Sequence, residues 1–319
     1  MKQQSLNSIY STLSTRRRYE VWFLRFMLAD GSGAWWFRYL LMNLGRPAGG
    51  GCAGNPLGMP AQVWATWFPR QGRPQSFIQG FSQTQLSLSE PSQPLQLRIN
   101  DDNMIDERSC KGRVCVDGHT VSWQLRYDST FGASMTEVGW IGFSRTPHSD
   151  AVFSGEVTLD DQSFRGEPLG YGLQGHNCGF RHRHLWNWTH CLAFDSTGRI
   201  STFEALEYEI PLGLQFRKAL LWHEGMRYTF EGIETISRDR EHLQWMFACS
   251  NAEGASLIAI VDGSGPGIHR LPYLKTDCSG TFEVANNSLA RATLYLSRQG
   301  RPLEQISTDG GAVIEMVGQ

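Results

Sequence analysis

Short runs of apolar and aromatic residues, separated by turn-forming residues, follow one another along the whole chain. The runs have the length and composition of β-strands, and Asp-Gly, Asn-Asp and Ser-Gly pairs between them favour tight turns. Together these features predict an antiparallel all-β protein. The predicted strands cover residues 19–28, 34–42, 63–68, 86–88, 95–99, 112–116, 120–127, 154–159, 189–194, 203–210, 227–236, 242–249, 255–261, 280–284, 290–296 and 312–316.

The number of strands is about twice that of one small barrel, which predicts two β domains. The segment 164–168 (FRGEP) has the composition of a connection, so we place the domains at residues 1–165 and 166–319. Residues 1–15 are polar, and we expect them to be frayed. Residues 214–223 fit either a short helix or a strand.

Composition narrows the class of partner. With 29 Lys and Arg against 31 Asp and Glu, the formal net charge is −2, so nucleic acid and acidic lipid are not expected partners. Aromatic residues make up 12% of the chain and charged residues 19%. No apolar run reaches the roughly 20 residues that span a bilayer. Composition therefore excludes classes of partner without naming one; a hydrophobic small-molecule substrate is what the resemblance given below implies, and we expect a monomer or a homodimer.

The seven cysteines are odd in number and form no C-x-x-C pair. This pattern predicts free thiols rather than a disulfide framework or a thiolate zinc site. Residues 14–25 begin like a twin-arginine signal, but Glu20 and Arg25 interrupt the stretch that should be apolar. We therefore expect the protein to be cytoplasmic.

The strongest local feature is the segment 170–179 (GYGLQGHNCG), which we interpret as a glycine-framed turn that holds His176 toward a pocket. If residues 181–190 form a strand, its alternation places five side chains on one face. These are His182, His184, Trp186, Trp188 and His190.

Three interpretations of these histidines stay open. His182 and His184 have the spacing of two metal ligands, with His176 or His190 as a third, but no carboxylate or cysteine partner stands at a diagnostic distance. One histidine could instead act as a general acid or base in an aromatic cavity. The third interpretation places His182 and His184 in solvent near a barrel mouth. We favour solvent for that pair and predict no metal.

Trp186 and Trp188 fit a barrel core, but tryptophan rings can also stabilise a carbocation and wall a polyene. Glu204 lies on the next predicted strand and shares a face with Leu206 and Tyr208. An enclosed carboxyl group keeps its proton more readily, as a proton donor must. Glu204 is therefore a candidate acid facing the same cavity.

In the first predicted hairpin, one acid and one base each share a strand face with aromatic residues. Glu20 shares a face with Trp22, and Arg38 shares a face with Trp36. The two charges either compensate each other as a buried pair, which we favour, or point into a polar pocket. No nucleophile elbow, dinucleotide fingerprint or zinc-binding helix is present, and residues 46–60 lack the Gly-Lys-Ser/Thr ending of a phosphate loop. We therefore expect a ligand cavity and no cofactor.

Four motifs stand in a familiar order: YEVWF at 19–23, GAWWFRY at 33–39, GHNCG at 175–179 and WNW at 186–188. Together they resemble the superfamily of AttH-like proteins, carotenoid 1,2-hydratase, tocopherol cyclase and the fungal Diels–Alderases of decalin biosynthesis. In that group the glycine turn commonly reads Asp-His-Glu-Trp-Gly. His176 and Gly179 match this pattern, whereas Gly175, Asn177 and Cys178 depart from it.

The resemblance implies two lipocalin-like β-barrel domains with a substrate cavity at or near their junction. It also implies hydration, cyclisation, isomerisation or pericyclic rearrangement of a hydrophobic isoprenoid or polyketide without a redox cofactor. Because both acids of the turn are missing, His176, Glu204 and Glu20 become the candidate catalytic residues. The candidate substrate-binding residues are Trp22, Arg38, Trp64, Tyr171, Asn177, Trp186, Trp188 and His190. A noncatalytic lipocalin-like carrier of an apolar ligand is the alternative.

Overall fold

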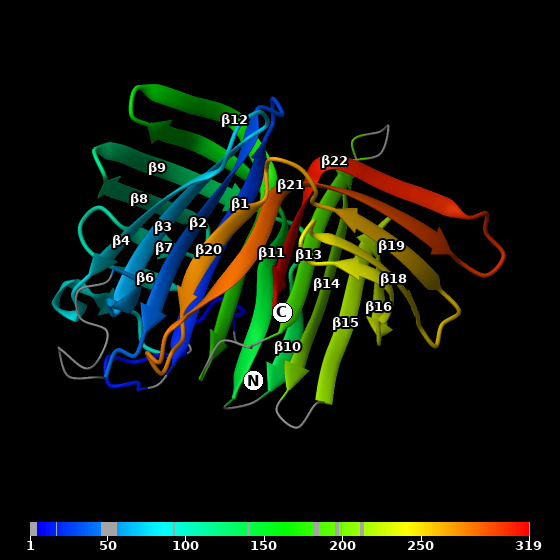
Figure 1. Cartoon of the computed structure of the whole chain (residues 1–319), viewed down its shortest axis with the longest axis horizontal. Helices are drawn as coiled ribbons and strands as arrows, with labels where there is room; N and C mark the ends of the chain where they lie inside the picture. The colour runs from blue at the N-terminus through cyan, green and yellow to red at the C-terminus, as the bar shows by residue number, and fades with distance from the viewer. Residues whose placement is uncertain are drawn as a thin grey trace.

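The computed structural model describes residues 5–16, 18–45, 56–91, 93–138, 141–180, 185–194, 198, 200–210 and 214–318. Within these residues the chain forms β-strands and two short 3-10 helices, η1 (Pro56–Gly58) and η2 (Gln83–Gln85). The prediction of an antiparallel all-β protein is therefore confirmed, with the strands arranged in two sheets (Figure 1).

The first sheet contains twelve strands in the order β4-β3-β2-β1-β12-β11-β9-β8-β7-β6-β5, with β10 paired to β11. Its strands are β1 (Tyr19–Leu28), β2 (Gly33–Met42), β3 (Ala61–Pro69), β4 (Gln75–Phe81), β5 (Ser87–Leu88), β6 (Gln96–Arg98), β7 (Met104–Asp106), β8 (Ser109–Val116), β9 (His119–Asp128), β10 (Ala133–Val138), β11 (Gly142–Leu159) and β12 (Gln162–Gly179).

The second sheet contains ten strands in the order β16-β15-β14-β13-β22-β21-β19-β18-β17, with β20 paired to β21. Its strands are β13 (Trp186–Phe194), β14 (Ile200–Ile210), β15 (Leu214–His223), β16 (Met226–Glu231), β17 (Glu234–Asp239), β18 (Gln244–Ser250), β19 (Ser256–Asp262), β20 (His269–Leu274), β21 (Thr281–Ser297) and β22 (Glu304–Val317).

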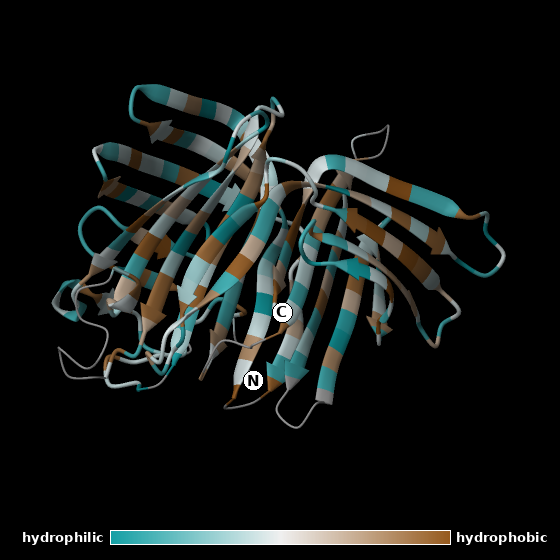
Figure 2. Cartoon of the chain, in the orientation of Figure 1, coloured by the Kyte–Doolittle hydropathy of each residue, from teal (hydrophilic) through white to brown (hydrophobic). Residues whose placement is uncertain are grey.

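Apolar and polar residues alternate along many strands, as the banding in Figure 2 shows. In β9, Val121, Trp123 and Leu125 are buried, whereas Gln124 and Arg126 between and beyond them are exposed. Successive side chains of a strand point to opposite faces, so this pattern gives one apolar face to the core. β1 and β2 are different, because nearly all of their residues are at least partly buried on both faces.

Each sheet curls around a core of its own. In the first sheet β3 and β4 come into contact with β8, and in the second β16 contacts β18. The first core is aromatic and includes Trp22, Trp35 and Phe37. The second includes Trp245 and Phe247. The apolar residues of these two inner faces thus hold each sheet together separately.

The two sheets pack against each other through a third apolar cluster. Phe23 and Trp36 come from the first sheet, and Trp188, Leu206 and Val313 come from the second. These positions alternate with the core positions along their strands, so β1 and β2 on one side and β13, β14 and β22 on the other bury both faces. The strand faces that point away from the two cores therefore form the contact between the two sheets.

Several local expectations need correction. The segment 170–179 is part of strand β12, not a turn, and residues 214–223 form strand β15. Residues 5–16 are not frayed, because Asn7, Ser8 and Ile9 are buried. The predicted domain border at 165 lies within β12, while the change from the first sheet to the second falls between Gly179 and Trp186. The division into 1–165 and 166–319 stays a prediction.

Five cysteines, Cys110, Cys115, Cys178, Cys191 and Cys249, are free thiols, as expected. Cys278 is disulfide-bonded, so the expectation of free thiols is wrong at that position. In the described part of the chain, no helix has the length and apolar character needed to cross a membrane.

Candidate functional site

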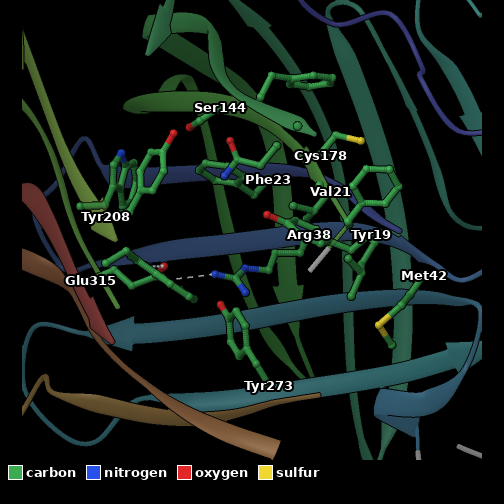
Figure 3. Close-up of a pocket in the computed structure, with 18 of the residues that line it drawn as sticks. Tyr19, Val21, Phe23, Arg38, Met42, Ser144, Cys178, Tyr208, Tyr273 and Glu315 are labelled. Atoms are coloured by element: carbon green, nitrogen blue, oxygen red, sulfur yellow. Dashed lines mark hydrogen bonds and ion pairs between the residues drawn. The ribbon is translucent and has the colours of Figure 1, made fainter. Parts of the chain in front are cut away.

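A pocket of about 530 Å³ opens between the two sheets. Its wall is mostly apolar and aromatic, and both sheets contribute to it (Figure 3). The lining residues are Tyr19, Val21, Phe23, Trp36, Arg38, Leu40, Met42, Leu57, Gln62, Trp64, Thr136, Val138, Ile141, Gly142, Phe143, Ser144, Asn177, Cys178, Gly179, Phe180, Trp186, Trp188, Leu206, Tyr208, Tyr273, Leu274 and Glu315.

Strand alternation explains which residues reach the pocket. Tyr19, Val21 and Phe23 are every second residue of β1, and they face away from the core of the first sheet. Arg38 lies opposite Phe23 in the β1–β2 register, so it projects from the same face. The period of two therefore places an arginine in an aromatic wall.

Arg38 forms an ion pair across the pocket with Glu315 of β22. Its Nη2 lies 3.3 Å from Glu315 Oε2, and Figure 3 shows the two side chains pointing toward each other from different sheets. Among the described residues that line the pocket, Glu315 is the only carboxylate and Arg38 the only arginine or lysine. The pocket thus contains one acid and one base in an aromatic surrounding.

Three aromatic rings surround the Arg38 guanidinium group. Its central carbon lies 4.5 Å from the ring centroid of Trp36, 4.7 Å from that of Tyr273 and 5.4 Å from that of Trp64. Cation–π attraction holds a guanidinium group at such distances. Burial nonetheless lowers the pKa of Arg38 to about 10, because the charge has left water.

Glu315 accepts hydrogen bonds on both carboxylate oxygens. Trp186 Nε1 donates to Oε1 at 2.8 Å, and Asn286 Nδ2 reaches Oε2 at 3.5 Å, beside Arg38. Burial raises the pKa of Glu315, whereas the nearby charge of Arg38 and the indole of Trp186 counter the rise. Burial outweighs these opposing effects, so the pKa of Glu315 stays above its ordinary value.

Glu204 lies next to the pocket, bound to one of its lining residues. Trp188 Nε1 donates to Glu204 Oε1 at 2.9 Å, and Thr146 Oγ1 of β11 lies 2.8 Å from Oε2. Burial raises the pKa of Glu204 to about 7. The predicted face is confirmed for its neighbours Leu206 and Tyr208, both of which line the pocket, but Glu204 itself is not part of the lining.

His190 lies opposite Glu204 in the β13–β14 register and is fully buried. Its Nε2 donates to the carbonyl oxygen of Ser149 at 2.8 Å. Burial lowers its pKa to about 3, and the charge of Arg25 adds to that shift, so the ring is neutral. His190 does not line the pocket.

His176 and Glu20 lie on the other side of the first sheet, inside its core. His176 Nε2 is 2.9 Å from Glu20 Oε1, and both side chains are inaccessible to solvent. Trp22 stacks on the His176 ring with centroids 4.6 Å apart. The structure thus brings these three candidates together, but away from the pocket.

The same Glu20–His176 pair holds the N-terminal segment in place. Glu20 accepts hydrogen bonds from the backbone nitrogens of Tyr10 and Ser11 at 2.8 and 2.7 Å, and His176 Nδ1 is 2.9 Å from the carbonyl oxygen of Leu6. The predicted pairing of Glu20 with Arg38 is wrong, because the two side chains project from opposite faces of the first sheet and bind other partners.

Of the remaining candidates, Arg38, Trp64, Asn177, Trp186 and Trp188 line the pocket. Tyr171 does not; its ring packs against Phe194 with centroids 4.9 Å apart. His182 and His184 lie outside the described residues.

Glu315 was missed by the sequence analysis. It lies in the predicted strand 312–316, where the run AVIEM contains one acid among apolar residues. A lone charge in such a run is a signal of a buried or functional group, and Glu20 and Arg38 were noticed for that reason. The same reasoning applied to the last strand would have found it.

One group of potential metal ligands lies elsewhere. Within the part of the chain that the structure describes, His223, Glu224 and Glu304 offer atoms within 4.8 Å of one another. Arg298 already pairs with both carboxylates, at 3.1 Å to Glu224 and with a short contact to Glu304. Two acids neutralised by an arginine are poor ligands for a cation, so this group does not make a metal centre.

No family model and no curated protein sequence matches the chain. Solved structures match its fold over nearly the whole length, among them the following two. Kievitone hydratase from Nectria haematococca covers 99% of this chain and 94% of its own, with a TM-score of 0.55 and 9% identity. A protein from Nitrosomonas europaea that is described as an AttH covers 94% of this chain and 92% of its own, with a TM-score of 0.50 and 12% identity. The resemblance to AttH-like proteins and hydratases noted in the sequence is thus confirmed at the level of the fold.

Proposed function

We propose that this protein is a hydratase-like enzyme that adds water to an apolar small molecule held between the two sheets. A shared fold does not by itself carry an activity, so the proposal rests on the pocket. The observation that carries it is the position of Glu315, a buried acid in a wall of tryptophan rings, paired with Arg38. The fold shared with kievitone hydratase supports the reaction class.

The proposed reaction begins with a proton. Neutral Glu315 transfers its proton to one carbon of a double bond, whose electron pair forms the new C–H bond and leaves a cation on the other carbon. The rings of Trp186 and Trp188, which also line the pocket, stabilise that cation through their negative faces. A water molecule then adds through its oxygen and returns a proton to the Glu315 carboxylate, which restores the acid.

Arg38 has a balancing role in this scheme. Its charge stabilises the Glu315 carboxylate after proton transfer, whereas burial favours the neutral acid before transfer. A pocket that held the acid fully ionised would lack a proton donor, and one without Arg38 would release the proton less readily. Such opposing influences suit a group that must both give and take a proton.

The proposal also covers the barrel type, the substrate class and the roles of the other candidate residues. We infer that each curled sheet is a lipocalin-like barrel and that the substrate is a polyene of isoprenoid or polyketide type. An internal nucleophile in place of water would turn hydration into cyclisation, with the same acid. Glu204 would position Trp188, while Glu20 and His176 would position the N-terminal segment and not touch the substrate.

The test is incubation of the purified protein with isoprenoid and polyketide polyenes in H₂¹⁸O, followed by mass spectrometry. The expected product carries the mass of one added water and the heavy oxygen. The variant Glu315→Gln should lose turnover but keep ligand binding. Quenching of tryptophan fluorescence measures that binding. Glu253→Gln, in an exposed turn of the second sheet, is the matched control and should react like the wild type.

Two results would contradict the proposal. If Glu315→Gln retains full turnover, Glu315 is not the acid. If every ligand that quenches fluorescence is returned unchanged by the wild-type protein, the pocket belongs to a carrier of apolar molecules and not to an enzyme.

A further inference from the structure

An arginine cluster lies on the far side of β14 from the pocket. It consists of Arg217 of β15 and Arg238 of β17, which both pair with Glu207 of β14, and of Arg240, which follows Arg238 by two residues and lies close enough for its charge to act on Arg238. Glu207 is adjacent in sequence to Leu206 and Tyr208, which line the pocket, so its side chain projects from the opposite face. The cluster therefore belongs to the inner side of the second sheet and is separate from the proposed active site.

Glu207 is buried and its carboxylate oxygens are fully engaged. Oε1 accepts a hydrogen bond from Arg217 Nε at 2.9 Å. Oε2 accepts one from Asn187 Nδ2 at 2.8 Å and a short one from Arg238 Nη2. One carboxylate thus neutralises at most one of the three guanidinium groups.

Within the described part of the chain, Glu207 is the only carboxylate that forms an ion pair with these arginines. Arg240 is only partly exposed, and among the described residues its Nε has no hydrogen-bond acceptor. The Nε atoms of Arg238 and Arg240 are both buried without an acceptor. Buried guanidinium N–H groups of this kind normally bind a carboxylate, a carbonyl or an anion.

Repulsion within the cluster is visible at Arg238. Burial lowers the pKa of Arg238 most, the carboxylate of Glu207 counters this, and the charges of Arg240 and Arg217 lower it further. Like charges held close together in a partly buried place cost stability. A bound anion would remove that cost and satisfy the unpaired N–H groups together.

We propose that the arginine cluster is a binding site for an oxyanion, the carboxylate or phosphate group of a small ligand. The planar fork of a guanidinium group matches two oxygens of either anion, and two neighbouring forks with free N–H groups bind it more tightly than one. Glu207 fixes Arg217 and Arg238 from one side and leaves Arg240 to close on the ligand. This site is independent of the proposed hydration reaction.

The test is isothermal titration calorimetry of the full chain with inorganic phosphate and, in a separate arm, with butyrate. Binding of either is expected in the wild type, and the arm that binds more tightly identifies the anion. Arg240→Gln should weaken that binding by about tenfold or more, the loss of one charge-assisted hydrogen bond. Arg113→Gln removes the same charge from an exposed position of the first sheet and should bind like the wild type.

The proposal is overturned if neither anion binds the wild type. It is equally overturned if Arg113→Gln weakens binding as much as Arg240→Gln, because the anion would then respond to net charge alone. Since Arg240 is not part of the pocket lining, the hydration assay on Arg240→Gln should match the wild type. Failure of one proposal therefore leaves the other standing.

Discussion

The indole of Trp188 donates a hydrogen bond to Glu204 Oε1 at 2.9 Å, and this bond joins the pocket wall to a fully enclosed carboxyl group. Thr146, from the first sheet, lies 3.0 Å from the same oxygen and 2.8 Å from the other. Glu204 therefore connects the two sheets at the place where they form the pocket. The protonation state of Glu204 therefore affects both the free energy of unfolding and the hydrogen bond that positions the Trp188 ring.

The first prediction concerns the pH dependence of stability. Because burial raises the pKa of Glu204 to about 7 from its ordinary 4.5, the folded chain keeps a proton that the unfolded chain releases. The stabilising effect of that proton is complete below pH 4.5 and is lost as the pH rises to about 7. Over this window Glu204 should lower the free energy of unfolding by about 3 kcal/mol.

Glu204→Gln should remove this component, since glutamine does not titrate. Urea unfolding at about pH 5 and about pH 8 measures the difference, which should be smaller in the variant than in the wild type. Glu253→Gln, which alters an exposed turn, should keep the wild-type difference. An unchanged pH dependence in Glu204→Gln would show that Glu204 is ionised in the folded state.

The second prediction concerns Arg25, which binds the first sheet to the second. Its guanidinium group is fully buried and donates to the carbonyl oxygens of Gly310, Gly311 and Ala312 at 3.1, 3.3 and 2.8 Å. A shorter contact reaches the carbonyl oxygen of Ser288. Arg25→Met would leave these acceptors buried without donors, so the free energy of unfolding should fall by about 3 kcal/mol or more.

Arg165→Met is the matched control for that experiment. Arg165 is exposed and pairs with Glu156 at the surface, where an ion pair contributes about 1 kcal/mol or less. Urea unfolding of both variants gives the comparison. Equal losses in the two variants would mean that Arg25 does not hold the sheets together.

The third prediction concerns the N-terminal segment. Glu20 accepts from the backbone nitrogens of Tyr10 and Ser11, and Glu20→Gln replaces one acceptor oxygen with a donor NH₂ group that would face one of these N–H groups. Because two donors repel, hydrogen exchange at Tyr10 and Ser11 should quicken by about tenfold or more. Amides of β9, far from this contact, should keep their rates. Unchanged exchange at both residues would contradict the anchoring role.

Much of the fold could be predicted because the alternation of apolar and polar residues within each strand shows which side chains share a face. Alternation placed Leu206 and Tyr208 on one face, and the motif around Trp186 and Trp188 indicated an aromatic cavity between two β units. Glycine misled the prediction at residues 170–179. Only glycine fits at positions 172 and 175 of strand β12. A Cβ at Gly172 would come within 1.8 Å of the Arg25 carbonyl oxygen, and a Cβ at Gly175 would come within 2.2 Å of the Phe23 ring. Their role is close packing and not a turn.

The partners of the charged residues could not be predicted, because pairing depends on which strands become neighbours. Arg38 and Glu315 are 277 positions apart and meet only after the two sheets pack. His176 and Glu20 likewise pair across β1 and β12, which are neighbours in the sheet but distant in sequence. Periodicity gives the face of a side chain and leaves the opposing residue undetermined.

The fourth prediction concerns the acid of the proposed reaction. Trp186 donates to Glu315 Oε1 at 2.8 Å and so holds down the pKa of that carboxyl. Trp186→Phe removes the donor and keeps an aromatic ring, so the pKa of Glu315 should rise by about one unit, the value of one hydrogen bond to a charged group. Carbon-13 NMR titration of the labelled carboxyl measures this shift directly.

If Glu315 supplies the proton, the pH–rate profile of hydration should move in the same direction, with activity reaching higher pH in Trp186→Phe, because a larger fraction of the acid stays protonated. Trp222→Phe, a ring that stacks on Phe131 with centroids 4.8 Å apart, is the control and should leave both the titration and the profile in place. A shift of the NMR midpoint without a shift of the profile would separate the two roles, since Glu315 would then titrate in the pocket while another group donates the proton.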